Sequence, residues 1–113
     1  MSDLDIAIVK RLVSADFPGA PELCEQVTRA MIKRRDLGTA LVLEAHLPNG
    51  LRRAEVERRV PVEAEGKDLD GTVIHLLVHV VNGYLKEVEI FREDGQQIHQ
   101  LPAVESLTVQ VFG

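Results

Sequence analysis

The sequence predicts an α+β domain in which two N-terminal helices pack on one face of an antiparallel sheet of four to six strands. Amphipathic helical patterns fill residues 1–38, and alternating apolar runs fill most of residues 39–113. Tight turns between those runs favour antiparallel neighbours, because parallel strands need long crossover connections. Helices followed by such strands typically form two packed layers. The chain of 113 residues suits one domain over residues 1–113.

The first 38 residues carry the helical signals. Residues 3–14 predict a short amphipathic helix, because apolar side chains recur on one face. A second helix is expected to begin at Pro21, whose missing N–H is not needed in a first turn, and to end at Gly38. The basic residues at 33–35 would then complement the helix dipole. The expected buried stripe of this helix consists of Leu23, Val27, Ala30 and Met31.

The strands outside the main hairpin are less sharply marked. Residues 39–47 alternate, with Leu41, Leu43, Ala45 and Leu47 on one side and Glu44 and His46 on the other. Residues 51–62 fit a strand or a short helix, and we favour the strand. Residues 63–71 predict a polar acidic loop, in which Asp68 and Asp70 resemble only the start of a calcium loop. Short strands are expected at 96–101 and 107–111.

The strongest element is a long β-hairpin over residues 72–95. Two runs rich in Val, Ile, Leu, Tyr and Phe flank Asn82-Gly83, the dipeptide that best tolerates positive φ in a tight turn. Asp94-Gly95 then ends the second strand in a further turn. We expect this hairpin to form the centre of the sheet.

Hydrophobic matching selects the register of this hairpin. A two-residue loop without a bulge would place Glu87 and Glu89 among aliphatic side chains, where ionised groups are costly to desolvate. We therefore expect a three-residue loop with a bulge at Gly83. In that register His75 lies across from Glu89, and Leu77 lies across from Glu87.

The same register divides the hairpin into two faces. Ile74, Leu76, Val78, Val80, Tyr84, Val88 and Ile90 share the face that the helices cover. His75, Leu77, His79, Leu85, Glu87, Glu89 and Phe91 share the outer face.

Charge and composition limit the possible partners. The formal net charge is −5, and the acidic excess lies wholly within residues 39–113. This balance argues against nucleic acid and anionic membranes, and it suits a basic partner protein as well as simple solubility. No apolar run is long enough to span a membrane, and acidic residues lie near the N-terminus, so a cytoplasmic location is expected. We expect the lone Cys24 to pack as a small buried apolar side chain.

The outer hairpin face supplies the candidate site residues. His75, Glu87 and Glu89 are catalytic candidates for acid–base chemistry or metal binding. His75 and His79 are roughly 13 Å apart along one strand, which prevents them from sharing one small ion. The candidate binding residues are Leu77, His79, Leu85 and Phe91. We identify no metal-binding or cofactor-binding motif, so the expected metal and cofactor are none.

Part of the hairpin follows a pattern found elsewhere. Gly83, Leu85, Val88, Glu89, Ile90, Phe91, Asp94 and Gly95 spell G-x-L-x-x-V-E-I-F-x-x-D-G. The segment 77–95 thereby resembles a recurring hairpin of small uncharacterised bacterial proteins, a resemblance that implies no activity. In size and charge, the chain is also similar to immunity proteins that neutralise secreted bacterial toxins.

Two functions follow as expectations. The first is a non-enzymatic protein-binding module of immunity or accessory type, whose outer face meets a partner, a second copy or the chain's own C-terminal segment. The alternative is a metal-dependent or acid–base enzyme that uses the His/Glu cluster of that face. The sequence leaves the partner, the substrate and the oligomeric state open.

Overall fold

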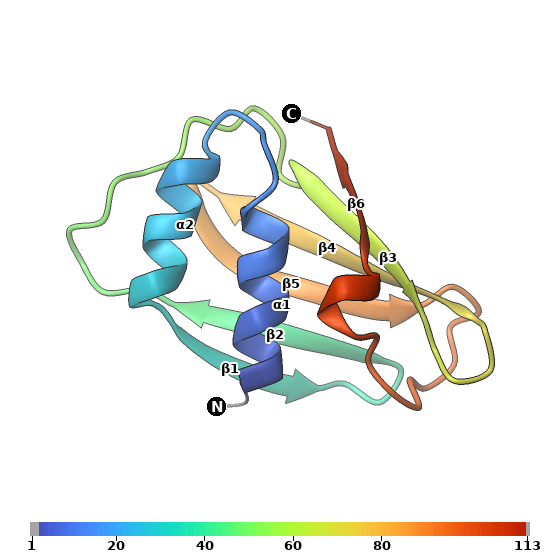
Figure 1. Ribbon diagram of the computed structural model, residues 1–113. Helices are drawn as coiled ribbons and strands as arrows, with labels where there is room; N and C mark the ends of the chain where they lie inside the picture. Colours follow the sequence, from blue (N-terminus) through green and yellow to red (C-terminus); the bar gives the residue numbers. More distant parts are fainter. Residues whose placement is uncertain (1–2, 113) are drawn as a thin grey trace.

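The computed structural model confirms two helices on one face of an antiparallel sheet, here with six strands (Figure 1). The structure describes residues 3–112. The helices are α1 (Asp3–Val13), α2 (Ala20–Arg29) and the short 3₁₀ helix η1 (Val104–Ser106). The strands are β1 (Met31–Asp36), β2 (Ala40–His46), β3 (Val62–Lys67), β4 (Val73–Val81), β5 (Tyr84–Arg92) and β6 (Thr108–Val111).

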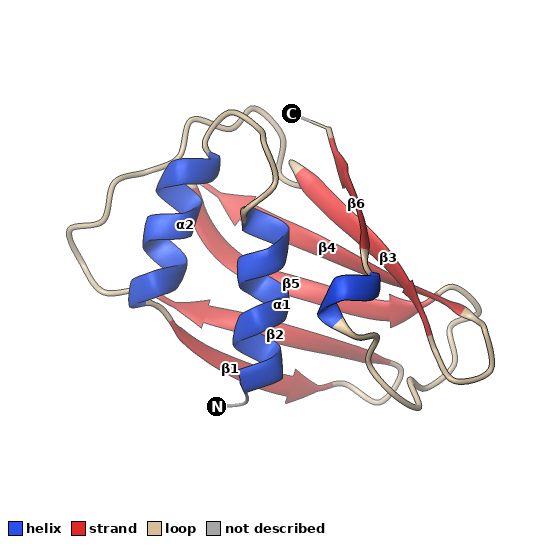
Figure 2. Cartoon of the chain, in the orientation of Figure 1, coloured by secondary structure: helices blue, strands red, loops and turns tan. Residues whose placement is uncertain are grey.

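The spatial order of the strands is β1-β2-β5-β4-β3-β6 (Figure 2). The predicted hairpin, β4 and β5, therefore occupies the centre of the sheet, and β1 and β6 form its edges. The core lies between the helices and the covered face of the sheet. Its fully buried side chains include Ile8, Leu12, Leu23, Leu43, Ile74, Leu76, Val78, Val88 and Ile90. Removal of this aliphatic surface from water is the main stabilising contribution to the fold.

The second helix is shorter than predicted. α2 ends at Arg29, and Ala30 adopts an extended backbone with φ −81° and ψ 150°. The residues that follow pair with β2 as an edge strand, in which only Ile32 is buried and Met31 is 54% exposed. Gly38, at φ 89°, lies in the turn from β1 to β2 and does not cap a helix.

The basic residues of β1 therefore have partners other than a helix dipole. Arg34 points to the helix side, where its Nε and Nη2 lie 3.1 and 2.5 Å from the carboxylate of Asp5 on α1. Asp5 is buried, so this two-pronged pair fastens the first helix to the edge of the sheet. Arg35 points the other way and pairs with Glu44 at 3.2 Å.

The predictions for residues 51–71 are largely wrong. Residues 51–61 form an irregular connection, and β3 begins at the last residue of the predicted strand and continues to residue 67 of the predicted acidic loop. The sequence shows no clear alternation of large apolar residues in this strand, because two of its inward residues, Ala64 and Gly66, are small. A Cβ on Gly66 would lie 2.4 Å from the ring of Pro102, so glycine is needed for the C-terminal segment to pack there. That segment contains no strand at residues 96–101, contrary to expectation.

The hairpin turn has a two-residue loop, not the predicted three-residue one. Asn82 and Gly83 both have positive φ, 54° and 83°, and Val81 pairs directly with Tyr84. The extra residue that restores hydrophobic matching is Lys86, farther along β5. The expected bulge therefore exists, but not at Gly83.

The displaced bulge shifts the predicted register by two residues. His75 pairs with Phe91, and Leu77 pairs with Glu89, so both predicted cross-strand pairs of His75 and Leu77 are wrong. Because a two-residue shift preserves the alternation, β4 and residues 87–91 still present the expected faces.

Leu85 and Tyr84 exchange their predicted faces. Leu85 is buried on the helix side, whereas Tyr84 is exposed. The buried amide of Gln26 on α2 explains this arrangement, because its Oε1 accepts the Leu85 N–H at 2.8 Å. Its Nε2 donates to the carbonyls of Gly83 and Arg52 at 3.0 and 2.9 Å. One side chain therefore joins α2, the hairpin turn and the connection from β2 to β3.

At the other end of the hairpin, Arg92 is 4% exposed and surrounded by acceptors. Its guanidinium donates to three carboxylates and one hydroxyl, those of Asp68, Asp70, Asp94 and Thr72. Asp68 also accepts three backbone N–H groups, those of Leu69, His99 and Gln100. The aspartates that resembled a calcium loop thus surround an arginine, which holds three loops together.

Gln26→Leu should destabilise the fold by about 2–4 kcal/mol, because the Leu85 N–H and the Arg52 carbonyl lose their partner in a buried region. Urea denaturation followed by circular dichroism measures this difference. Gln97→Leu is the matched control, since Gln97 is exposed. Equal stability of the two variants would contradict the role assigned to Gln26.

Asp68→Asn should destabilise the protein at neutral pH but not at strongly acidic pH. Burial raises the pKa of Asp68, but hydrogen bonds from backbone amides and Arg92 outweigh it and hold the pKa well below its ordinary value. A depressed pKa stabilises the fold above the unfolded value of about 3.9, and this contribution disappears as the pH falls through the folded pKa. Thermal melts from neutral to acidic pH should show the variant and the wild type converge. The control is Asp16→Asn, because Asp16 is exposed. A stability difference between Asp68→Asn and the wild type that did not change with pH would contradict the role assigned to Asp68.

Candidate functional site

The face of the sheet opposite the helices is the first candidate site, and we call it the open face. Both α1 and α2 lie on the other side of the sheet (Figure 1). The outward residues of the four inner strands, given by strand pairing, define it: Ala40, Val42, Glu44, His46, Glu63, Glu65, Lys67, Val73, His75, Leu77, His79, Val81, Tyr84, Glu87, Glu89 and Phe91. In the range 3–112, the C-terminal segment does not cover this face, because β6 pairs with the edge of β3.

Two carboxylates of neighbouring strands face each other on the open face. Glu44 and Glu87 lie directly opposite each other on β2 and β5. Glu44 is balanced by Arg35 at 3.2 Å and His46 at 3.7 Å. Glu87 makes no hydrogen bond or ion pair with any of residues 3–112. Like charges in directly opposite positions are destabilising, so this part of the face favours an added cation.

His79 forms the tightest polar contact on the open face. Its Nε2 lies 2.9 Å from a carboxylate oxygen of Glu89. The Nε–H of Arg59, from the connection before β3, donates to Nδ1 at 3.2 Å. Arginine can only donate, so Nδ1 is an acceptor and Nε2 carries the hydrogen that Glu89 accepts. Both ring nitrogens are therefore occupied, and neither is free to act as a general base.

His75 belongs to a separate group. Its Nε2 lies 3.4 Å from Glu93 and its Nδ1 lies 3.8 Å from Glu65. Its ring also packs against Phe91, with centroids 5.3 Å apart. The predicted cluster of His75, Glu87 and Glu89 is thus not brought together by hydrogen bonds. Within the described chain, no three His, Cys, Asp or Glu side chains gather closely enough to hold a metal ion.

The predicted binding residues divide between the two faces. Leu77, His79 and Phe91 are half-buried on the open face. Val42 adds an apolar side chain that sequence reasoning missed, only 7% exposed. Leu85 does not belong to this site, because the bulge turns it into the core at 2% exposure. The open face therefore has apolar side chains at its centre with carboxylates among them.

Cys24 has no role in the open face. Its Sγ–H donates to the carbonyl of Val13 at 3.2 Å, and burial raises the pKa of the thiol. A raised pKa keeps the thiol protonated, which matches the expected role of a small apolar residue.

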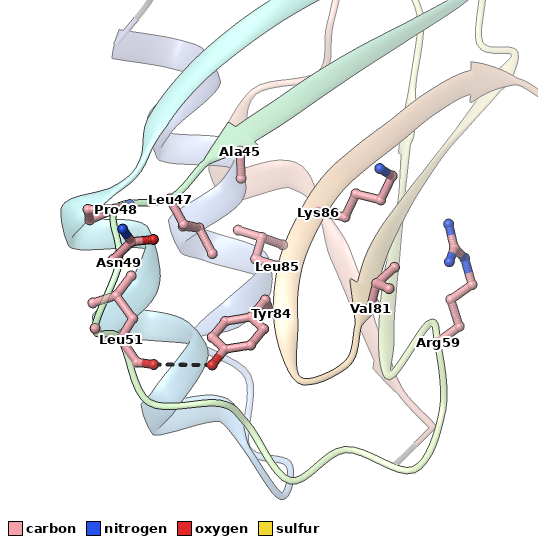
Figure 3. A pocket seen from close by; sticks show the side chains of 11 residues that line it. Ala45, Leu47, Pro48, Asn49, Leu51, Arg59, Val81, Tyr84, Leu85 and Lys86 are labelled. Carbon is pink, nitrogen blue, oxygen red and sulfur yellow. Dashed lines mark hydrogen bonds between the residues drawn. The ribbon is translucent and has the colours of Figure 1, made fainter.

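The second candidate site is concave and lies at the tip of the hairpin, and we call it the hairpin-tip groove (Figure 3). Its volume is about 670 Å³. The groove is lined by Ala45, Leu47, Pro48, Asn49, Gly50, Leu51, Arg59, Val81, Tyr84, Leu85 and Lys86. Sequence reasoning missed this site because its walls come from a turn, a bulge and an irregular connection that meet only in the folded chain.

Comparison with known proteins adds no relative: no family profile, curated protein or solved structure matches this chain. None of the helices within residues 3–112 is long and apolar enough to cross a membrane. We therefore infer the function from the residues of the open face and of the groove.

Neutral His79 should populate the Nε2–H tautomer, because Arg59 occupies Nδ1 as a donor. Long-range proton–nitrogen NMR correlation at alkaline pH distinguishes the two nitrogens. Arg59→Ala should shift the Nδ1 resonance of His79 and leave His75 unchanged. A wild-type His79 with its proton on Nδ1 would contradict the described geometry.

Proposed function

We propose that this chain is a non-enzymatic protein-binding module of immunity or accessory type, whose open face binds a basic surface on a partner protein. The observation that carries the proposal is the facing pair Glu44 and Glu87, in which Glu87 has no cationic partner among residues 3–112. A lysine or arginine of a partner, placed between the two carboxylates, would relieve their repulsion.

The apolar residues of the open face support the same proposal. Val42, Leu77 and Phe91 lie beside the carboxylates and give a partner surface apolar side chains to pack against. Specific interfaces typically combine apolar contacts with polar ones. The net charge of −5 would speed encounter with a basic protein. We place this module in the bacterial cytoplasm, where the lone Cys24 stays reduced.

The enzymatic alternative has less support from the geometry. His79 and Glu89 form a tight pair, but Arg59 occupies the second ring nitrogen that a general base would need. His75 lies between Glu65 and Glu93 without a polar contact to the other catalytic candidates.

The test compares two double variants that remove the same charge from different places. Glu44→Gln/Glu87→Gln neutralises the open face, and Glu57→Gln/Glu105→Gln neutralises exposed residues outside it. The immobilised proteins select partners from a bacterial lysate, and titration calorimetry then measures affinity for each identified, purified partner.

We expect a partner with net positive charge, whose affinity falls roughly tenfold or more in the open-face variant and stays unchanged in the control. Leu77→Lys should weaken the same complex by placing an unpaired charge in the interface. Glu87→Gln should also raise the stability of the free chain by about 0.2–1 kcal/mol, because it removes a like-charge contact. Equal affinity of both double variants, or a wild type that selects no partner, would overturn the proposal.

A further inference from the structure

We infer that the hairpin-tip groove binds a small carboxylate with an apolar body, such as an aryl or branched alkyl acid. This site is distinct from the protein-binding surface proposed above, and it rests on different residues. Its volume of about 670 Å³ falls in the range typical of small-molecule sites.

The groove is a direct result of where strand pairing stops. β2 and β5 pair from Ala40↔Phe91 only as far as Glu44↔Glu87, and the next residue of β5 is the bulged Lys86. Beyond that point, the turn at 48–50 leads the chain away from the sheet. The two strands therefore separate, and a hollow opens between Leu47 and the start of β5 (Figure 3).

The floor of this hollow is apolar. Leu51 is 7% exposed and Leu85 is 2% exposed, so both are fixed by the core. The ring of Tyr84 stands beside Leu51, and its hydroxyl donates to the Leu51 carbonyl at 3.4 Å. An aromatic or branched body of a ligand would lie against this ring and the aliphatic side chains.

Two cationic side chains line the same groove. Arg59 lies across the hairpin from Leu47 and Leu51, and Lys86 lies above the floor (Figure 3). The Nε of Arg59 is bonded to His79, whereas its two terminal nitrogens make no hydrogen bond within residues 3–112. Those nitrogens present the parallel N–H pair that a carboxylate accepts, and Lys86 forms no ion pair within the same residues.

The backbone of Arg59 is held in place before a ligand arrives, and its Nε is bonded to His79. Its backbone carbonyl accepts the Val80 N–H at 2.7 Å, and the Ala54 N–H donates to the Gly83 carbonyl at 2.7 Å. The connection that carries Arg59 is thereby attached to both sides of the hairpin turn. A preorganised cation loses less freedom on binding, which favours affinity.

The experiment is an NMR titration of the uniformly labelled protein with phenylacetate. Phenylacetamide has the same shape without charge, and inorganic phosphate has charge without an apolar body. We expect saturable shifts at Leu51, Tyr84, Leu85 and Lys86 with phenylacetate, and a response of the His79 ring through Arg59. Arg59→Gln should weaken binding roughly tenfold, as for loss of a charge-assisted hydrogen bond.

Arg58→Gln is the matched control, because Arg58 is an exposed neighbour that does not line the groove. It should keep the wild-type affinity, and Lys86→Gln should weaken binding as a second variant. The Val80 N–H donates to the backbone carbonyl of residue 59. An unchanged Val80 amide resonance in Arg59→Gln would therefore show that the connection from β2 to β3 keeps its position. The inference is overturned if phenylacetamide or phosphate binds as tightly as phenylacetate, if Arg59→Gln binds normally, or if no saturable shift occurs at the groove.

Discussion

The buried guanidinium of Arg92 is the constraint on which one end of the sheet depends. Alternation along β5 sends this residue to the helix side after Val88 and Ile90, although its side chain is charged. A buried charge is tolerated only when it is paired and hydrogen-bonded. The turn from β3 to β4 and the turn after β5 bring acceptors to this cluster. The segment before η1 brings backbone N–H donors, which Asp68 accepts. The irregular ends of the strands are thus ordered by one side chain.

The opposite end of the hairpin is ordered by a neutral side chain. Gln26 supplies acceptor and donor groups to the turn where the sheet hydrogen bonds are interrupted. Its contact with Leu85 accompanies the bulge at Lys86, and the bulge determines both candidate sites. It keeps the carboxylates of β5 on the open face, and it ends the pairing with β2 where the groove begins. The two surfaces therefore have a common structural origin, although they differ in charge.

Local patterns were sufficient for the first helix, the central hairpin and strands β2 and β6, because each has a clear period of apolar residues. They also located the start of the second helix, but not its end. They failed for β1, which has a single buried residue, Ile32, and for β3, whose inward positions include Ala64 and Gly66. The register error has another cause: the contact between Gln26 and Leu85 joins residues 59 apart in the chain. Sequence reasoning identified the polar and apolar mixture of the outer face. It missed the actual partners of both histidines, because these depend on the register and on Arg59.

The two edges of the sheet differ in a way that affects self-association. β1 ends in the charged run Lys33–Asp36, and charged side chains at an edge discourage further strands. β6 consists of Thr108, Val109, Gln110 and Val111, with no charge and no proline. Its outer backbone groups are the ones that a foreign extended peptide would find easiest to pair with. Any growth of this sheet by strand addition is therefore directional, favoured at β6 and discouraged at β1. In a concentrated solution, this difference between the edges would limit assembly through edges to pairs, because residues 3–112 offer one receptive edge per molecule.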